Sequence, residues 1–571
     1  MSAVAEHGAR TWPRAGHRPQ VRIEVLALAS SLYFALTCNG AFWRHFAALG
    51  GFGQPSGMAM AASLFIATTA LTTALLCLVL YRWNAKPLLA LLFIATALAA
   101  HYMDHYGIYL DPEMIRNVLQ TDRRESMELV DGSLAASLAL HAALPIAALA
   151  WVRLAPAPVR RGWLLRSASV AAAVLCAALA IGVSFEGIAA MMRNHPDLRH
   201  LITPGNYLVS LARVAGSDGG TRRREPVGLD ARVVPAATQR RPRVLVIVVG
   251  ETVRAGNWGL DGYERQTTPE LAATPGIVNF GNVTACGTST AVSVPCMFSP
   301  FGRHDYDADR IRHSQSLMHV LDHAGIATDW RDNQGGCKGV CEGLAFESFV
   351  GSSDNELCDG ERCLDEVMLK GLGRRIRDTH GDMVVVLHQL GNHGPSYFRR
   401  YPHRLARFEP TCETAELARC SRGQIVNAYD NAILYTDHFL ARTVHLLAAE
   451  GSHDAALLYV SDHGESLGEH GLYLHGIPYP IAPDTQLRVP MTIWLSPALL
   501  HDDHIDMDCM QQAARRPASH DNLFHSVLGL MQVQTSVYDR SLDLFASCDG
   551  AVAPNPLSSS SRQAQDAFQA M

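Results

Sequence analysis

The chain has 571 residues, of which 48% are apolar and only 18% are charged, and its formal net charge is -6. This length exceeds that of one ordinary domain, and the apolar share is high for a chain that is soluble throughout. No long basic block interleaved with aromatic residues occurs, so nucleic acid is not expected as a partner. These features favour a membrane portion joined to a separate folded domain.

Five apolar runs in the first third of the chain are each about long enough to cross roughly 30 Å of hydrocarbon. The alternative is a set of buried helices in a soluble domain, but five such runs would leave that domain little polar surface. The sequence therefore predicts an α-helical transmembrane domain of five helices at residues 1–185. The runs lie near residues 25–42, 58–81, 87–106, 133–152 and 163–185.

Basic residues predict the orientation of these helices, because Lys and Arg are enriched on the cytoplasmic side of a membrane. They precede the first run and occupy the connections between the second and third and between the fourth and fifth runs. The N-terminus is thus expected in the cytoplasm, and five spans would carry the C-terminal part to the opposite side. These residues are Arg10, Arg14, Arg18, Arg22, Arg82, Lys86, Arg153, Arg160 and Arg161.

Ten of the 13 cysteines follow residue 280, and their spacing suggests five disulfide bonds. Reduced cysteines or a zinc-binding knot are alternatives, but no CxxC pair occurs. Disulfides form in oxidising compartments, which agrees with a C-terminal part outside the cytoplasm. The suggested pairs are Cys286 with Cys296, Cys337 with Cys341, Cys358 with Cys363, Cys412 with Cys420, and Cys509 with Cys548.

Two segments follow the apolar runs. Residues 186–242 are expected to hold an amphipathic helix near 207–211 and then a flexible linker rich in Gly, Arg and Pro, from Gly216 to Pro242. Residues 243–571 alternate β-branched runs with helical patterns, which predicts an α/β domain with a central, mostly parallel sheet. Ligands of such sheets bind beyond the carboxyl ends of the strands.

Polar side chains follow three of the predicted strands, which end near residues 249, 387 and 460. Glu251 follows the first strand, the sequence HQLGNH the second, and Asp462 and His463 the third. Carboxylate and imidazole are ligands of open catalytic zinc sites, and the strands of one sheet can bring them together. The start of a capped helix is the alternative for Asp462 and His463. We therefore expect a metal site here.

Small hydroxyl residues fill the stretch between Cys286 and Cys296, where a helix is predicted to begin near Thr290. The backbone N–H groups of a helix N-terminus favour a phosphate, and a nearby zinc ion makes a hydroxyl a better nucleophile. Helix capping is the more common role of such a turn. The flanking cysteines and the metal ligands elsewhere support a catalytic role.

The connection between the third and fourth runs carries a pattern of its own. Asn117, Thr121 and Glu125 are four residues apart. On a helix this spacing places all three on one face. The alternative to a binding face is a solvated helix surface.

The whole chain resembles the lipid A phosphoethanolamine transferases, a family that includes the mobile colistin-resistance enzymes. Its soluble part resembles the alkaline phosphatase and sulfatase superfamily. The resemblance implies zinc on Glu251, Thr290, Asp462 and His463, with Thr290 as the catalytic residue that carries phosphoethanolamine as a covalent intermediate. The motifs that carry it are VVGET from Val248, CGTSTAVSVPCMFS from Cys286, GCKGVC from Gly336, HQLGNHGP from His388, YDNAILYTD from Tyr429, and SDHGESLGE from Ser461 followed by Leu474, His475 and Gly476.

The resemblance also implies which residues bind the substrates. Lys338, His393 and His475 would surround the phosphate as charge partners or proton carriers, roles that these side chains fit chemically. A second zinc ion could lie near these histidines. The face carrying Asn117, Thr121 and Glu125 would receive the ethanolamine head group. Solvated side chains and ordinary polar contacts are the alternatives.

The expected reaction transfers phosphoethanolamine from phosphatidylethanolamine to a lipid A phosphate and gives resistance to polymyxins such as colistin. The enzyme would be a monomer among the lipids of the bacterial inner membrane, with its catalytic domain in the periplasm. One alternative is another acceptor, such as the lipopolysaccharide core or a surface glycan. Others are hydrolysis by a phosphodiesterase or sulfatase, a glycerol-phosphate polymerase, and a membrane sensor without catalysis.

Two positions depart from the pattern of the family. Gly335 stands where many relatives have a serine, which removes one expected hydroxyl contact. Cys509 and Cys548 are additional to the commonest set of disulfides. Neither departure involves a predicted zinc ligand.

Overall fold

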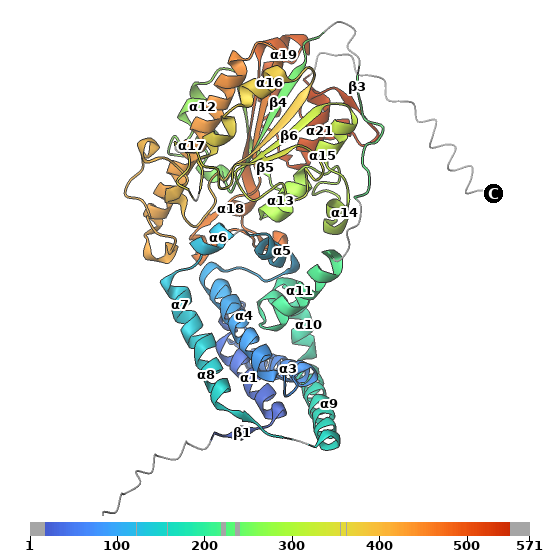
Figure 1. Cartoon of the computed structure of the whole chain (residues 1–571), viewed down its shortest axis with the longest axis vertical. Coiled ribbons are helices and arrows are strands. Elements are labelled where there is room, and N and C mark those ends of the chain that lie inside the picture. Colours follow the sequence, from blue (N-terminus) through green and yellow to red (C-terminus); the bar gives the residue numbers. More distant parts are fainter. Residues whose placement is uncertain are drawn as a thin grey trace, which may run out of the picture. The chain divides into compact units, whose positions relative to one another are not determined.

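The computed structural model describes residues 18–121, 123–156, 158–218, 224–234, 240–354, 356–360 and 362–548. The chain forms two compact units (Figure 1). One contains residues 1–112 and 130–213, and the other contains residues 113–129 and 214–571. The short segment 113–129 therefore belongs to the same unit as the C-terminal domain, although apolar helices precede and follow it in the sequence.

Four helices of the first unit are long and apolar enough to cross a membrane. The predicted first span is instead a pair of helices, α1 (Ile23–Thr37) and α2 (Gly40–Ala48), bent by 49°. Among the residues that the structure describes, the candidate spans thus number four, or five if the bent pair is one span. The four helices are α3 (Pro55–Val79), α4 (Ala85–Tyr106), the run Gly132–Trp151 formed by α7, η1 and α8, and α9 (Val159–Val183).

The bend between α1 and α2 has a local cause in Asn39. Its side-chain amide donates a hydrogen bond to the carbonyl of Phe34 at 2.9 Å, and its side-chain oxygen accepts one from the backbone N–H of Thr203 at 2.8 Å. An Asn side chain that bonds to the backbone competes with helical hydrogen bonding. The apolar pattern, which continues across Asn39, could not reveal this break.

An eight-stranded sheet forms the centre of the second unit, in the order β13-β5-β12-β9-β4-β8-β6-β7. Only β12 runs antiparallel to its neighbours, β9 and β5. The prediction of a central, mostly parallel sheet is therefore confirmed. The strands are β4 (Arg243–Gly250), β5 (Ile277–Thr284), β6 (Ala327–Asp332), β7 (Phe346–Ser348), β8 (Met383–His388), β9 (Asp454–Ser461), β12 (Arg488–Leu495) and β13 (Ala518–Ser519).

Helices cover both faces of this sheet (Figure 1). Successive side chains of β4 point to opposite faces, and all of them from 244 to 249 are buried. The odd-numbered residues pack with α15 (Leu317–His323) and α21 (Asp521–Leu530). The even-numbered residues pack with α16 (Leu372–Asp378) and α17 (Arg422–Ala449). Burial on both faces explains why the strand is apolar throughout.

Shorter elements complete the two units. In the first unit, α10 (Phe185–Asn194) follows α9. α11 (Gly205–Asp218) contains the predicted amphipathic stretch and runs from the first unit, which ends at Arg213, into the second. Among the shorter elements of the second unit are α5 (Pro112–Gln120), α6 (Arg123–Glu128), α12 (Pro269–Ala273), α13 (Thr290–Met297), α14 (Ala308–His313), α18 (Asp484–Leu487), α19 (Pro497–Asp502), α20 (Met507–Ala513), β3 (Arg232–Val233), β10 (Ser466–Leu467), β11 (Tyr473–Leu474) and β14 (Val533–Gln534).

Part of the predicted linker is folded. β3 pairs with β14, and Val227 and Ala231 are buried in the same core as α15 and α21. The linker prediction is therefore wrong for residues 224–234, because these apolar side chains pack on the domain. Residues 219–223 and 235–239 lie outside the described residues.

All five suggested disulfides are present, including the additional pair of Cys509 and Cys548. Four of them close loops with sequence separations of 4 to 10 residues. Cys286 and Cys296 enclose the start of α13, which begins at Thr290 as predicted.

Candidate active site

Four side chains meet beyond the carboxyl ends of β4 and β9, the positions that the strand pattern predicted. Glu251 and Asp462 follow paired residues at the ends of these two strands. The Thr290 hydroxyl lies 3.0 Å from Oε2 of Glu251 and 3.4 Å from Nε2 of His463. The same His463 nitrogen lies 3.4 Å from Oε1 of Glu251 and 3.3 Å from Oδ2 of Asp462.

The burial of this group calls for a positive charge. Glu251, Asp462 and His463 are 0% exposed, and Thr290 is 4% exposed. Burial raises the pKa of Asp462 and lowers that of His463, because an environment without water disfavours the charged form of each side chain. A buried carboxylate needs a partner of opposite charge, and a divalent cation would supply one.

The hydrogen bonds of Asp462 show where such a cation fits. Oδ1 accepts bonds from the backbone N–H of Thr252 at 3.1 Å and of His463 at 2.7 Å. Oδ2 is buried and, among the described residues, accepts no hydrogen bond. Together with Glu251 and Thr290, this oxygen and the His463 imidazole form a set of oxygen and nitrogen donors that suits zinc.

Thr290 is the first residue of α13, and Ser289 is its N-cap. The hydroxyl of Ser293, one turn further on, donates to the carbonyl of Asp462 at 2.5 Å. This bond connects the helix to the end of β9. The N-terminus of α13 therefore presents both the hydroxyl and the positive end of the helix dipole, a combination that favours a phosphate.

His520 also connects the end of β9 to the loop before α13. This residue was not identified from the sequence. Its Nε2 donates to the carbonyl of Ser461 at 2.9 Å, and its Nδ1 accepts from the backbone N–H of Cys286 at 3.1 Å. Burial lowers the pKa of His520 to about 4, which agrees with a neutral ring that has one donor and one acceptor. A single histidine far from the other motifs gave no sequence signal.

Replacing His520 with phenylalanine is expected to destabilise the protein. The change leaves two buried backbone groups without partners, and each costs about 1–3 kcal/mol. Thermal unfolding of the full chain in detergent should therefore show a clearly lower Tm. The control is His501→Phe, because 84% of the His501 side chain is exposed and its replacement should leave the Tm unchanged. An unchanged Tm for His520→Phe would contradict this role.

Two further histidines lie beside the metal-ligand set. The rings of His463 and His475 are 4.4 Å apart, and those of His475 and His393 are 5.7 Å apart. Nδ1 of His475 lies 2.9 Å from Oε2 of Glu465, and the hydroxyl of Tyr397 donates to Oε1 of Glu465 at 2.7 Å. His463, Glu465 and His475 could hold a second metal ion. Glu465 fixes the orientation of His475, and the motifs had not assigned it a role.

Lys338 lies in the disulfide loop beyond β6, in a half-buried position. Its ammonium group donates to the carbonyl of Gly335 at 3.0 Å. A Cβ atom at Gly335 would lie 3.2 Å from this ammonium group, so a side chain at this position would require the lysine to shift slightly. The assignment of Lys338 to the phosphate stays a prediction.

The segment 113–129 does not form the single helix that the spacing predicted. α5 ends at Gln120, and α6 begins at Arg123. Asn117 and Thr121 are half-buried, and the Thr121 hydroxyl donates to the carbonyl of Asn117 at 2.7 Å. Such back-bonding bends or ends a helix. The side chain of Glu125 lies outside the described residues, so the role of these three residues stays a prediction.

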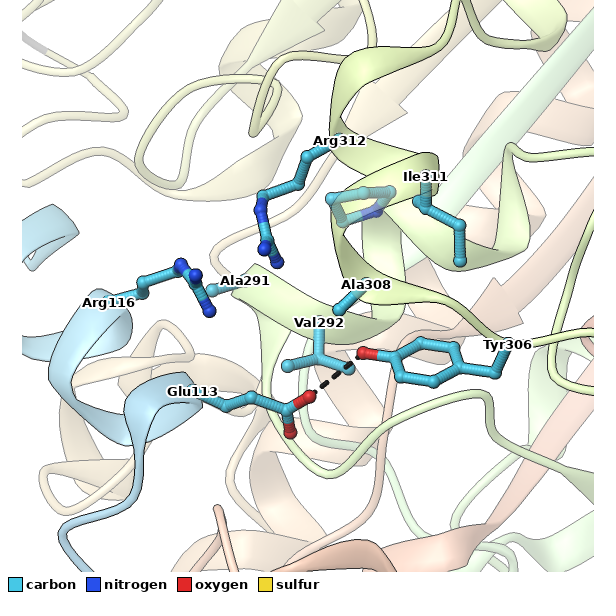
Figure 2. A pocket seen from close by; sticks show the side chains of 9 residues that line it. Glu113, Arg116, Ala291, Val292, Tyr306, Ala308, Ile311 and Arg312 are labelled. Atoms are coloured by element: carbon cyan, nitrogen blue, oxygen red, sulfur yellow. Dashed lines mark hydrogen bonds between the residues drawn. The ribbon is translucent and has the colours of Figure 1, made fainter. Parts of the chain in front are cut away.

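The same segment lies beside the helix that carries Thr290. The Tyr306 hydroxyl donates to Glu113 at 2.9 Å (Figure 2). Next to this bond is a small pocket, which Ala291 and Val292 of α13 help to line. Arg116 and Arg312 point toward each other across it (Figure 2). The segment thus contributes side chains directly next to α13.

Comparisons with known proteins agree with this arrangement. The sequence family described as phosphoethanolamine transferase EptA/EptB matches residues 68–218, and the sulfatase family matches residues 243–533. Phosphoethanolamine transferase EptA of Escherichia coli K12 is 34% identical over 536 residues, which cover 93% of this chain and 98% of that protein. Phosphatidylethanolamine transferase Mcr-1 of Escherichia coli is 36% identical over 492 residues, which cover 84% of this chain and 90% of that protein.

A solved structure shows the same architecture. The integral membrane protein lipooligosaccharide phosphoethanolamine transferase A from Neisseria meningitidis matches with a TM-score of 0.88 and 34% identity, over 93% of this chain and 100% of that chain. Its soluble domain, solved separately, matches with a TM-score of 0.56 and 42% identity. The resemblance found in the motifs is therefore confirmed, and the chain belongs to the EptA-type family of phosphoethanolamine transferases, with a sulfatase-like C-terminal domain.

Proposed function

We propose that the protein transfers phosphoethanolamine from phosphatidylethanolamine to a phosphate of lipid A, with Thr290 as the nucleophile and zinc held by Glu251, Thr290, Asp462 and His463. One observation carries the proposal. The Thr290 hydroxyl lies at a helix N-terminus and within 3.4 Å of two buried ligand side chains. The transmembrane helices and the lipid substrates named for the relatives support a lipid donor and a lipid acceptor.

The first half of the reaction loads the enzyme. The Thr290 oxygen attacks the phosphorus of the donor, its proton passes to Glu251, which already accepts its hydrogen bond, and the bond to the glycerol oxygen breaks. His475, oriented by Glu465, would protonate the departing diacylglycerol through Nε2. When bound, zinc supplies positive charge that favours the deprotonated threonine and the charge developing on the phosphoryl oxygens.

The second half transfers the group. A lipid A phosphate oxygen attacks the phosphorus, and the bond to the Thr290 oxygen breaks. The proton held by Glu251 returns to this oxygen and regenerates the hydroxyl, while His475 takes up a proton from solvent. His393 and Lys338 would contact the phosphoryl oxygens as donors. The product carries an added ammonium group, which lowers the negative charge of lipid A and so weakens binding of cationic polymyxins.

The five disulfides support a catalytic domain in the periplasm, because such bonds persist in oxidising compartments. The protein would then be a monomer of the bacterial inner membrane with its N-terminus in the cytoplasm.

Mass spectrometry of lipid A tests the proposed acceptor. Cells that express the protein are expected to contain lipid A with an added phosphoethanolamine group, and cells that express the Thr290→Ala variant are not. If the donor is consumed while lipid A stays unmodified, the acceptor is another molecule, such as the lipopolysaccharide core or a surface glycan.

A further inference from the structure

The segment 113–129 ends in a buried cluster of charges within the second unit. Glu128 is 9% exposed. One of its oxygens lies 2.7 Å from Nη2 of Arg400, and the other lies 2.5 Å from Nη2 of Arg362. The Arg400 side chain is 0% exposed, so its charge depends on Glu128 for compensation.

Arg400 connects this cluster to the active site. Its Nε donates to the backbone carbonyl of His393 at 2.6 Å, while its Nη2 bonds to Glu128. Because a guanidinium group is planar and rigid, these two bonds fix Glu128 and the His393 backbone relative to each other.

His393 is close to the reacting groups. Its ring lies 5.7 Å from the ring of His475, which lies 4.4 Å from that of His463, one of the candidate zinc ligands. Met114 of the segment also lies close to Gly476, the residue after His475. A Cβ atom at Gly476 would lie 2.4 Å from the Met114 methyl carbon. The segment thus adjoins the chain next to both histidines.

We infer that Glu128 is a positioning residue for the transfer reaction, acting through Arg400 to hold the His393 backbone where the imidazole can contact the phosphoryl group. This inference rests on the proposed function. A purely structural role would need only a well-packed interface, since apolar side chains of similar volume stabilise such a site as well as a buried ion pair does. The directional bond from Arg400 to the His393 carbonyl adds a geometric constraint that apolar packing cannot provide.

The loading half-reaction isolates this effect. The full chain is placed in phosphatidylethanolamine vesicles without acceptor, and the release of diacylglycerol is measured over time. The loading rate is expressed per folded, zinc-loaded protein. Glu128→Gln keeps the size of the side chain and removes its charge. The maximal loading rate of this variant is expected to fall at least about tenfold, the scale expected when a catalytic group is misplaced by up to 1 Å. The donor concentration that gives half of the maximal rate should change little. Glu128→Asp should retain part of the rate.

Two comparisons separate positioning from stability. Asp382→Asn removes the acid of a partly buried ion pair with Arg240, in which the two side chains are 2.5 Å apart. Asp382 precedes the first residue of β8, so it lies at the end of the sheet opposite to the site. This variant should lower the Tm and leave the loading rate per folded protein unchanged. In a His393→Ala background, Glu128→Gln should cause no further loss, because both changes act through the same imidazole.

The inference is overturned if Glu128→Gln loads Thr290 at the wild-type rate, if Asp382→Asn reduces the rate per folded protein as strongly, or if the loss from Glu128→Gln persists undiminished without His393. Failure of the proposed function is recognised separately, since the wild-type protein would then load no phosphoethanolamine on Thr290.

Discussion

Thr290→Ala is expected to abolish phosphoethanolamine transfer, with a loss of roughly 10⁴-fold or more, the scale seen when an enzyme loses its nucleophile. The hydroxyl is the group that lies within 3.4 Å of both Glu251 and His463. Alanine is well tolerated in a helix, and Glu251, Asp462 and His463 remain to hold the metal. The fold should therefore survive, and transfer from labelled phosphatidylethanolamine in vesicles measures the loss.

Thr290→Ser is the matched control for this prediction. It keeps the oxygen and removes only a methyl group, so a measurable part of the activity should remain. Unfolding temperatures close to the wild-type value in both variants would show that the difference is chemical. Transfer by the alanine variant at a rate similar to that of the serine variant would refute the role of Thr290.

Asp462→Asn is expected to have the second largest effect, through the metal. An asparagine preserves the volume and can keep the oxygen that accepts the N–H groups of Thr252 and His463. It replaces the buried, unbonded Oδ2 with an amide nitrogen, which cannot bind a cation and carries no charge. Zinc affinity should fall by more than about 100-fold. This exceeds the loss that is typical when a residue hydrogen-bonded to a metal ligand, rather than the ligand itself, is removed.

Metal analysis of the purified full-length variant, together with the transfer assay, measures this effect. Asp382→Asn removes a partly buried carboxylate at the opposite end of the sheet and should retain the wild-type zinc content. Wild-type zinc content in Asp462→Asn would place the metal elsewhere, for instance on Glu465 and His475, the second candidate set.

The central sheet and the convergence of Glu251, Asp462 and His463 could be predicted because each depends on local sequence. A strand buried on both faces must be apolar throughout, and β4, β8 and β9 show this in their residues. Parallel neighbouring strands must end at the same edge, so polar residues after those strands come together. Glu251, Asp462 and His463 followed from that rule alone, and Thr290 needed the family resemblance as well.

Contacts that depend on the tertiary structure could not be predicted. His520 is 57 residues beyond His463, and the packing of α21 against α13 brings it to the loop that begins at Cys286. The salt bridge between Glu128 and Arg400 joins positions 272 residues apart. Breaks within helices were also missed. The competing hydrogen bond of Asn39 does not change the apolar pattern, and that of Thr121 does not change the four-residue spacing of the polar side chains.

The covalent intermediate is the most direct test of the account. The wild-type protein is incubated with phosphatidylethanolamine in the absence of acceptor and digested, and the peptide that contains Thr290 is analysed by mass spectrometry. One phosphoethanolamine group is expected on Thr290, and it should disappear when lipid A is added. Release of diacylglycerol with an unmodified Thr290, or with the group on another residue, would contradict the account.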